Sequence, residues 1–358
     1  MGKRILVAPL DWGLGHATRC IPIIRELMVQ NADVVLAADG RPFELLRREF
    51  PDLQILRMPG VSVNYGSQSN MMFTIAKQFP SILRAIADEH KALQPLLREH
   101  HLNAVISDNR FGLYSRLIPT AFLTHQIRIL VPRPFHFLES PLALLNRFAI
   151  NRFTQCWIPD IAGAANLSGI LSHTPPLPKN AKFIGPLSRF HRMPKQDEAI
   201  DCVVVLSGPE PQRTMFESAL MEQLKTLSVK SVVVRGIPER KQKMKMAENV
   251  TVISSLSSEE LNKLVACASV VIARPGYSTL MDLAVLGKKA LLIPTPGQTE
   301  QEYLGSDLMA KGICAIQAQK NLDVHNGMEQ ALHASGFTAI GAESPSLRSV
   351  LSSFLATV

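Results

Sequence analysis

The segment Lys3 to His16, with the sequence KRILVAPLDWGLGH, combines an apolar run with a glycine-containing loop. Its apolar run as far as Pro9 is bounded by polar or turn residues, which predicts a strand. A loop with two glycines follows, and apolar residues then recur at helical spacing from Ile21 to Met28. A strand, a glycine loop and a helix in this order predict the start of an α/β fold.

The same alternation continues through the first half of the chain. We expect strands at 33–38, 54–58, 104–107 and 121–124, and helices at 42–49 and 81–97. Strands that alternate with helices in this way predict a parallel, doubly wound sheet. The first half therefore predicts a Rossmann-like domain.

A second series of the same kind follows a polar, basic segment without periodicity at 188–198, which indicates a linker. Here we expect strands at 202–206, 231–234, 250–253, 269–273 and 290–294, and helices at 214–227, 258–266 and 278–286. The tail at 346–355 has helical spacing and is expected to pack back onto a domain surface. The predicted fold class is α/β, with Rossmann-like domains at 1–187 and 199–340, the linker 188–198 between them, and a C-terminal helix in 341–358.

Length and composition agree with this division and exclude several protein classes. The chain has 358 residues, and roughly 150 residues make one domain. The longest apolar run, Leu264 to Ala273, has ten residues, whereas a membrane span needs about 18. The N-terminal apolar stretch is too short for a secretory signal. The five cysteines are at least 46 residues apart, which excludes a finger-type metal site. We expect a cytoplasmic protein with reduced thiols.

The net charge of +8 lies entirely in the first half of the chain. Residues 1–190 contain 21 Lys and Arg against 13 Asp and Glu, whereas the remainder contains 17 of each kind. This distribution predicts an anionic partner for the first half: a phospholipid surface, a phosphorylated acceptor or a nucleic acid. Nucleic acid is the least favoured of these, because aromatic residues make up only 6% of the chain and the basic residues are dispersed.

One segment of the first half mixes apolar residues with arginines. Apolar residues from Phe135 to Phe153 are mixed with His136, Arg147 and Arg152, and Arg133 stands just before them. This pattern has two interpretations, a surface that lies on a membrane with its arginines near lipid phosphates or an ordinary core stripe.

Candidate site residues follow the strand ends of the first half. Gly13 and Gly15 let the backbone turn tightly before the first helix, and His16 lies where α/β proteins bind ligands. Asp108 ends a later strand and is a candidate to orient His16, while His125 follows the next strand. The alternatives are a capping or packed His16 and a turn Asp108.

The second half has three loops that suit a phosphorylated sugar. One begins a helix, where free N–H groups hold phosphate, and one turn later it offers a carboxylate for ribose hydroxyls. Another is dense in amide and carboxylate side chains, which suit sugar hydroxyls. A third follows the first strand and includes an arginine that either meets a diphosphate or is solvated. The residues concerned are Arg274, Gly276, Tyr277, Ser278, Thr279 and Asp282 in the first loop, Gln298, Glu300 and Gln301 in the second, and Ser207, Gly208 and Arg213 in the third.

With these motifs in order, the whole chain resembles the two-domain GT-B glycosyltransferases. Within them it is most similar to the family 28 group, which contains the lipid II-forming N-acetylglucosaminyltransferase and the galactolipid synthases. The resemblance depends most on the spacing from Gly276 to Gln301. It implies two Rossmann-like domains that face each other across a cleft, and a nucleotide sugar, UDP-linked in this group, as donor.

The resemblance also implies roles for individual residues. His16 corresponds to the acceptor-side general base, and Asp282 stands in place of the ribose-binding carboxylate, usually Glu. Gly276 to Thr279 resemble the diphosphate-binding helix start, Glu300 and Gln301 the pair that touches the donor sugar, and Ile253 and Ser254 fall near the strand end that meets uracil. The loop at 207–213 departs from the family's glycine-rich version, and the loop at 294–302 departs from its aromatic-rich version. The resemblance therefore does not imply which sugar the donor carries.

The implied reaction is inverting, metal-independent sugar transfer to a hydroxyl of a lipid-linked or glycan acceptor. His16 takes the proton of the acceptor hydroxyl, and the helix start at Ser278 stabilises the departing diphosphate. No cofactor is expected, and the absence of an Asp-x-Asp motif agrees with a site without metal. An anionic membrane surface is expected to contact the first half, on the inner face of the membrane. A UDP-sugar 2-epimerase of the same fold is the alternative enzyme.

Overall fold

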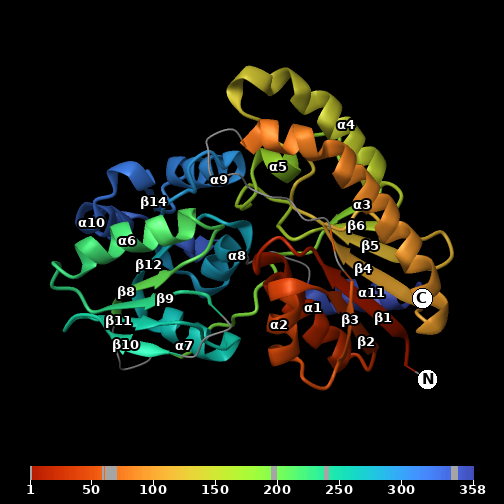
Figure 1. The fold of residues 1–358 in the computed structure, drawn as a ribbon, viewed down its shortest axis with the longest axis horizontal. Helices are drawn as coiled ribbons and strands as arrows, with labels where there is room; N and C mark the ends of the chain where they lie inside the picture. Colours follow the sequence, from red (N-terminus) through yellow and green to blue (C-terminus); the bar gives the residue numbers. More distant parts are fainter. Residues whose placement is uncertain (1, 59, 61–70, 195–199, 238–241, 340–345) are drawn as a thin grey trace. The chain divides into compact units, whose positions relative to one another are not determined.

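The computed structural model describes residues 2–58, 60, 71–194, 200–237, 242–339 and 346–358. These residues form two compact units, drawn in Figure 1. The first unit holds the described residues between 2 and 187 together with 346–358, and the second holds those between 188 and 339. The parts of the predicted linker and tail at 195–198 and 341–345 lie outside the described residues.

The first unit is built on a parallel sheet with the strand order β3-β2-β1-β4-β5-β6-β7 among its described residues. The strands are β1 (Arg4–Pro9), β2 (Asp33–Ala38), β3 (Gln54–Arg57), β4 (Ala104–Asp108), β5 (Thr120–Leu123), β6 (Gln155–Ile158) and β7 (Ala181–Phe183). Every neighbouring pair runs parallel, and the register places Pro9 of β1 beside Asp108 of β4. The order reverses between β1 and β4, so this point is the topological switch of the sheet.

Helices cover both faces of this sheet. They are α1 (Gly15–Val29), α2 (Gly40–Glu49), α3 (Met71–Glu99), the 3-10 helix η1 (Arg133–Leu138), α4 (Glu139–Ile150), α5 (Ile170–His173) and α11 (Leu347–Leu355). Leu93 and Leu97 of α3 pack into one core cluster with the strands. On α11, Phe354 is buried and stands edge-on to the buried Trp157 of β6, which fastens the C-terminal helix to this unit.

The second unit repeats the plan with a sheet of order β10-β11-β9-β8-β12-β13-β14. Its strands are β8 (Ile200–Val205), β9 (Ser231–Val234), β10 (Lys243–Lys245), β11 (Val250–Ile253), β12 (Ala268–Ala273), β13 (Lys289–Leu292) and β14 (Ala315–Ile316). The edge strand β10 is antiparallel to β11, and the other described pairs are parallel. The switch point lies between β8 and β12.

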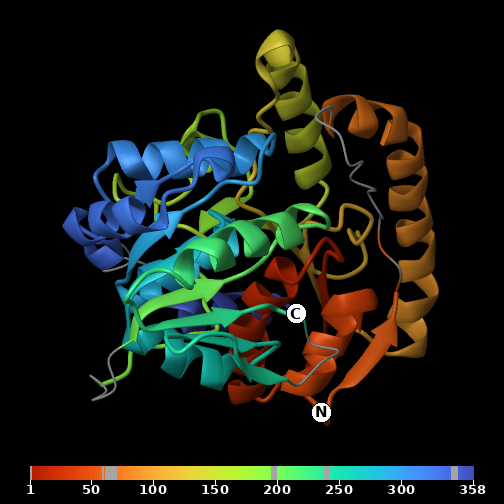
Figure 2. The same ribbon diagram turned by 60° about the vertical axis from the view of Figure 1, so that its left-hand side comes forward.

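One face of the second sheet is covered by α6 and α10, which share its core cluster with the strands. Figure 2 shows α6 in green along this face. The helices of the unit are α6 (Gln212–Leu224), α7 (Ser258–Cys267), α8 (Tyr277–Leu286), α9 (Thr299–Ala310) and α10 (Val324–His333), with the 3-10 helices η2 (Gln319–Asn321) and η3 (Phe337–Ala339). Ser257 closes a capping box with Glu260, which fixes the start of α7.

The predicted class of two Rossmann-like α/β domains is confirmed, with differences of detail. The first helix starts at Gly15 rather than Ile21, so Gly15 and His16 lie in its first turn and not in the loop. The prediction did not include strands β6, β7, β10 and β14 or helices α4, α5, α9 and α10, most of which are short. No helix of the described residues is both long and apolar enough to cross a membrane.

Candidate active site

In the first unit, His16 and Asp108 meet at the switch point of the sheet. His16 stands in the first turn of α1, directly after β1, and Asp108 ends the neighbouring strand β4. The Nδ1 atom of His16 lies 3.0 Å from Asp108 Oδ1. Asp108 is fully buried, whereas the His16 side chain keeps 17% of its surface exposed. The pair therefore has a buried carboxylate and an imidazole that solvent reaches.

A third side chain, Arg19, completes this cluster, and the sequence analysis missed it. Arg19 is one helical turn after His16 and is only 2% exposed. Its Nε donates to Asp108 Oδ2 at 2.7 Å, and its Nη2 contacts Asp108 Oδ1. The same Nη2 lies 3.0 Å from His16 Nδ1. The i, i+3 spacing of His16 and Arg19 is the signal that would have found it.

The carboxyl group of Asp108 is held in its ionised form. Burial raises its pKa, but the charge of Arg19 and the imidazole of His16 outweigh this and lower the pKa to about 2. With its proton on Nδ1, His16 donates to the ionised Asp108 and keeps Nε2 free to take a proton, which is the arrangement of a general base with an orienting carboxylate. With its proton on Nε2, the ring would instead accept at Nδ1 from the Arg19 Nη2–H that lies 3.0 Å away.

The other predicted residues of this unit have different surroundings. Gly13 is exposed in the loop, with a φ of +75° that favours glycine. Asp11 fixes that loop by accepting from the backbone N–H of Asp39 and Gly60. His125 was predicted to contact the acceptor, but it is 4% exposed and its Nδ1 lies 3.1 Å from Arg19 Nη1. Its ring belongs to the buried network and offers little surface to a substrate.

In the second unit, three loops follow the adjacent strands β8, β12 and β13 at the carboxyl edge of the sheet. Gly208 has a φ of +107°, and a side chain there would start 3.7 Å from the hydroxyl of Thr295. Gly276 is the N-cap of α8 and brings no side chain to that helix start. Ser278 and Thr279 in the first turn are half-buried. Small residues thus open the backbone at the switch point.

Thr295 is a second residue that the sequence analysis missed. It lies between two prolines after β13 and is 6% exposed. Its Oγ1 has no hydrogen-bond partner among the described residues. Buried hydroxyls are rarely left unpaired, so this one calls for a ligand or water beside Gly208.

Asp282, the predicted ribose carboxylate, lies one turn further along α8. Its Oδ1 accepts a hydrogen bond from Ser188 Oγ at 2.5 Å. Burial raises the pKa of Asp282 to about 6, against the lowering effects of the nearby Arg189 charge and of the Ser188 hydroxyl. At neutral pH the group is thus mostly a carboxylate that has lost part of its hydration.

Arg274 was predicted to bind the donor, and the structure corrects this. It is completely buried, and its guanidinium donates to the backbone carbonyls of Ile293, Pro294 and Gln212 and to the Gln319 side chain. Its guanidinium carbon also lies 4.1 Å from the centre of the Phe216 ring. Burial lowers the pKa of Arg274 to about 10, so it stays cationic at neutral pH. Arg274 ties the loops together from inside.

Arg213 and Tyr277 also differ from their predicted roles. The guanidinium of Arg213 pairs with Glu210 at 2.6 Å and with Glu217 at 3.5 Å, so the neighbouring carboxylates balance its charge. Such a group is poorly suited to attract a diphosphate. The Tyr277 side chain is 4% exposed and packs inside the unit.

The remaining donor residues lie at the same edge of the sheet. Gln301 is buried, and its Oε1 accepts from the Thr295 backbone N–H at 2.8 Å, so it shapes the loop. Gln298 and Glu300 are half-buried at the start of α9, and Ser207 is exposed. Ile253 ends β11, two strands from β8, and Ser254 follows it; Ile253 is half-buried and Ser254 is buried.

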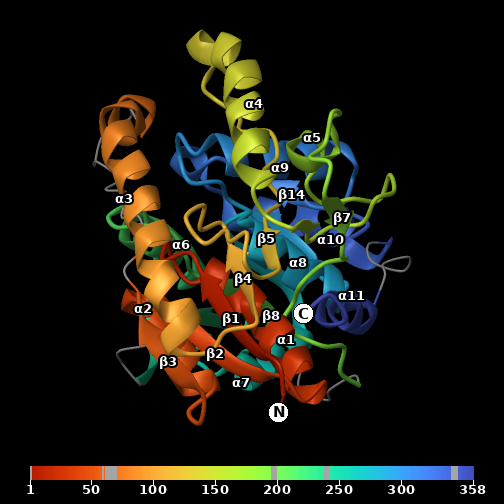
Figure 3. The same cartoon turned by 90° about the vertical axis from the view of Figure 1, so that its right-hand side faces the viewer.

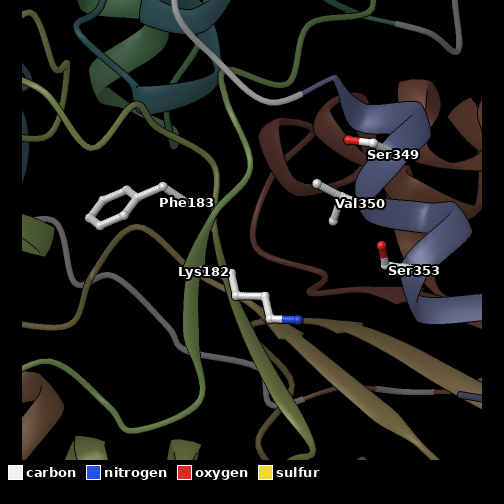
Figure 4. Close-up of a pocket in the computed structure, with 5 residues that line it drawn as sticks. All are labelled: Lys182, Phe183, Ser349, Val350 and Ser353. Carbon is white, nitrogen blue, oxygen red and sulfur yellow. The ribbon is translucent and has the colours of Figure 1, made fainter.

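Two further observations concern residues outside these clusters. No group of three His, Cys, Asp or Glu in the described part of the chain is placed to hold a metal ion, and metal independence stays a prediction. A shallow pocket of about 280 Å³ lies between β7 and α11 (Figure 4). It is lined by Lys182, Phe183, Ser349, Val350 and Ser353, and none of these was a predicted site residue.

Comparison with known proteins agrees with this geometry. Residues 203–336 match the glycosyltransferase family 28 C-terminal domain. An uncharacterised glycosyltransferase of Methanopyrus kandleri is 22% identical over 327 residues, which cover 86% of this chain and 91% of the relative. A second relative, from Methylobacterium nodulans, is named UDP-N-acetylglucosamine–N-acetylmuramyl-(pentapeptide) pyrophosphoryl-undecaprenol N-acetylglucosamine transferase. It is 24% identical over 321 residues, which cover 80% of this chain and 76% of the relative.

Solved structures share the whole fold. The glycosyltransferase SnogD of Streptomyces nogalater superposes with a TM-score of 0.65 at 15% identity, covering 99% of both chains. Acinetobacter baumannii MurG superposes with a TM-score of 0.57 at 14% identity, covering 99% of this chain and 100% of the other. The fold is therefore the two-domain fold of these GT-B glycosyltransferases. Because its second unit also matches the family 28 C-terminal domain, the chain is similar to the family 28 glycosyltransferases, which supports sugar transfer from a nucleotide sugar.

Proposed function

We propose that this glycosyltransferase moves a sugar, with inversion, from a UDP-sugar to a hydroxyl of a lipid-linked or glycan acceptor. The observation that carries the proposal is the contact of 3.0 Å between His16 and the buried Asp108. The oriented imidazole takes the proton of the acceptor hydroxyl while the hydroxyl oxygen attacks the anomeric carbon. Because this attack displaces the diphosphate directly from the opposite side, one step inverts the anomeric configuration.

The second unit supplies the donor site in this proposal. Backbone N–H groups at the start of α8 and the unpaired hydroxyl of Thr295 donate to the diphosphate beside Gly208. They stabilise the negative charge that develops on the leaving group, without metal. The Asp282 carboxylate accepts from the ribose hydroxyls, which restores the hydrogen bonds that burial removed.

In this proposal, the donor sugar and the nucleotide base contact different loops at the carboxyl edge of the second sheet. Glu300 and Gln301 at the start of α9 are proposed to contact sugar hydroxyls, and Ile253 with Ser254 at the end of β11 the uracil ring. Uracil is supported by the relatives that are named as UDP-N-acetylglucosamine transferases. Those names also support a lipid-linked acceptor.

The test is to incubate the protein with UDP-N-acetylglucosamine and with thymidine-diphosphate sugars, with and without lipid-linked and soluble glycan acceptors. We expect UDP release only when an acceptor is present, an inverted anomeric centre in the product by NMR, and no loss of rate with a chelator. A retained configuration would overturn the inverting step. Conversion of the UDP-sugar to its 2-epimer without acceptor would instead establish the epimerase alternative.

A membrane-contacting surface on the first unit is the second part of the proposal. The segment 135–153 is not a core stripe, because Phe137, Leu144, Leu145 and Phe148 are 58–72% exposed. These residues lie on η1 and α4, which stand out from the rest of the first unit in Figure 3. We name them the α4 apolar surface. Exposed aromatic and leucine side chains beside basic residues suit an anionic lipid interface. A cytoplasmic protein that binds peripherally to the inner face of the membrane through the α4 apolar surface stays a prediction.

Vesicle sedimentation tests the α4 apolar surface. The double variant Phe137→Ser/Phe148→Ser is expected to bind anionic vesicles at least about tenfold more weakly, because each ring loses its burial in the interface. Binding of the wild type should fall with salt and with the removal of anionic lipid. Leu332→Ser, which removes an exposed leucine from α10 of the second unit, is the control. Equal binding of all three proteins would disprove the membrane contact.

A further inference from the structure

Arg19 lies next to the proposed base and connects three polar side chains. Its guanidinium contacts Asp108 through two nitrogens and lies 3.0 Å from His16 Nδ1 and 3.1 Å from His125 Nδ1. It is 2% exposed, and Asp108 is completely buried. The charge on this arginine therefore acts in a place where water screens little of it.

We propose that Arg19 is a positioning residue whose guanidinium balances the charge of Asp108, so that Asp108 orients His16 without keeping it protonated. The proposal rests on the proposed role of His16 as general base. It adds a requirement to that role: the base must be oriented by a carboxylate and yet be uncharged when the acceptor arrives.

The physical problem is the protonation state of His16. A buried carboxylate 3.0 Å from an imidazole favours the imidazolium, because an isolated buried charge is costly and a proton on the ring pairs with it. An imidazolium cannot accept the proton of a hydroxyl. With Arg19 present, the arginine and Asp108 form a pair of zero net charge. A second positive charge on His16 would also lie against the Arg19 guanidinium, which opposes protonation.

The other charged or titratable groups around this cluster leave the balance unchanged. Cys20 on α1 faces Asp108 at 3.7 Å, and burial raises the pKa of its thiol, so it stays neutral. Asp11, in the loop before α1, has its carboxylate 3.9 Å from Arg110 and accepts two backbone N–H groups. His125, which follows β5, has its Nδ1 3.1 Å from Arg19 Nη1, where the guanidinium N–H is the donor because a guanidinium does not accept hydrogen bonds.

The experiment follows the imidazole of His16 by NMR titration in the full chain without substrate, with the signal assigned by its loss in His16→Gln. In Arg19→Gln the midpoint of the His16 titration is expected to rise by roughly 1–2 pH units. The acidic limb of the kcat/KM pH profile should rise by the same amount. Arg25→Gln removes a surface arginine of the same helix that pairs with Glu49, and it should change neither.

A second comparison covers the case in which Arg19→Gln does not fold. In the Asp108→Asn background no buried carboxylate is left unpaired, so Arg19→Gln/Asp108→Asn should fold. Its His16 midpoint is expected to lie above that of Asp108→Asn alone, because the guanidinium no longer opposes the proton. Equal midpoints in this pair, or an unchanged midpoint in folded Arg19→Gln, would overturn the proposal. If His16→Ala retains full activity while the midpoints shift as stated, the base assignment fails and the charge balance stands.

Discussion

Replacement of His16 by alanine is expected to lower kcat/KM by about 10²–10⁴-fold, which is the usual contribution of a general base. The reason is that the acceptor hydroxyl must lose its proton as it attacks, and Asp108 holds the imidazole for that transfer at 3.0 Å. The measurement is steady-state transfer with the best donor and acceptor pair. His16 is half-buried at a helix start rather than in the core, so the variant should keep its fold.

Nucleotide affinity separates this effect from a loss of binding. The affinity of His16→Ala for UDP, measured by calorimetry, should stay within about twofold of the wild type, because His16 belongs to the first unit and the proposed donor residues to the second. Asp282→Asn should show the opposite pattern, with UDP affinity lowered by about tenfold, since the amide offers one acceptor oxygen where the carboxylate offers two. Wild-type turnover in His16→Ala would exclude the base assignment.

Arg274→Met is expected to destabilise the second unit by about 3–5 kcal/mol. Four acceptor groups, three of them backbone carbonyls, lose their buried donor, and Phe216 loses the cation that lies over its ring. Methionine fills much of the space but donates no hydrogen bond. Because the same carbonyls belong to the loops around Thr295 and Gln212, UDP affinity should fall together with stability.

The two units can be followed separately in this experiment. Both tryptophans of the chain, Trp12 and Trp157, belong to the first unit. Urea unfolding of Arg274→Met should therefore move the transition seen by circular dichroism to lower urea while the tryptophan fluorescence transition moves much less. Arg213→Met, in the first turn of the neighbouring helix α6, removes ion pairs and one long contact with the Arg235 carbonyl, and it should cost about 1 kcal/mol or less. If Arg274→Met were as stable as Arg213→Met, the role of Arg274 as the buried donor to the loop carbonyls would be wrong.

Much of the fold and part of the candidate site follow from local pattern. Apolar runs with period two or without polar interruption, alternating with runs of period 3.6, specify parallel strands and crossover helices. The carboxyl ends of parallel strands share one edge, so the sequence predicts that His16 and Asp108 lie close together, and the structure brings them into contact. The three loops of the second unit were found by the same rule.

Local sequence pattern thus predicts the alternation of strands and helices and the residue types that follow the strand ends. Contacts between distant segments show that Arg274 turns inward, that Arg19 stands between Asp108 and two histidines, and that the Thr295 hydroxyl is buried with no hydrogen-bond partner in the part of the chain that the structure describes. The physical reason is one of range. Periodicity is a property of neighbours along the chain, whereas the direction and burial of a polar side chain depend on partners tens of residues away, as Arg19 and Asp108 show.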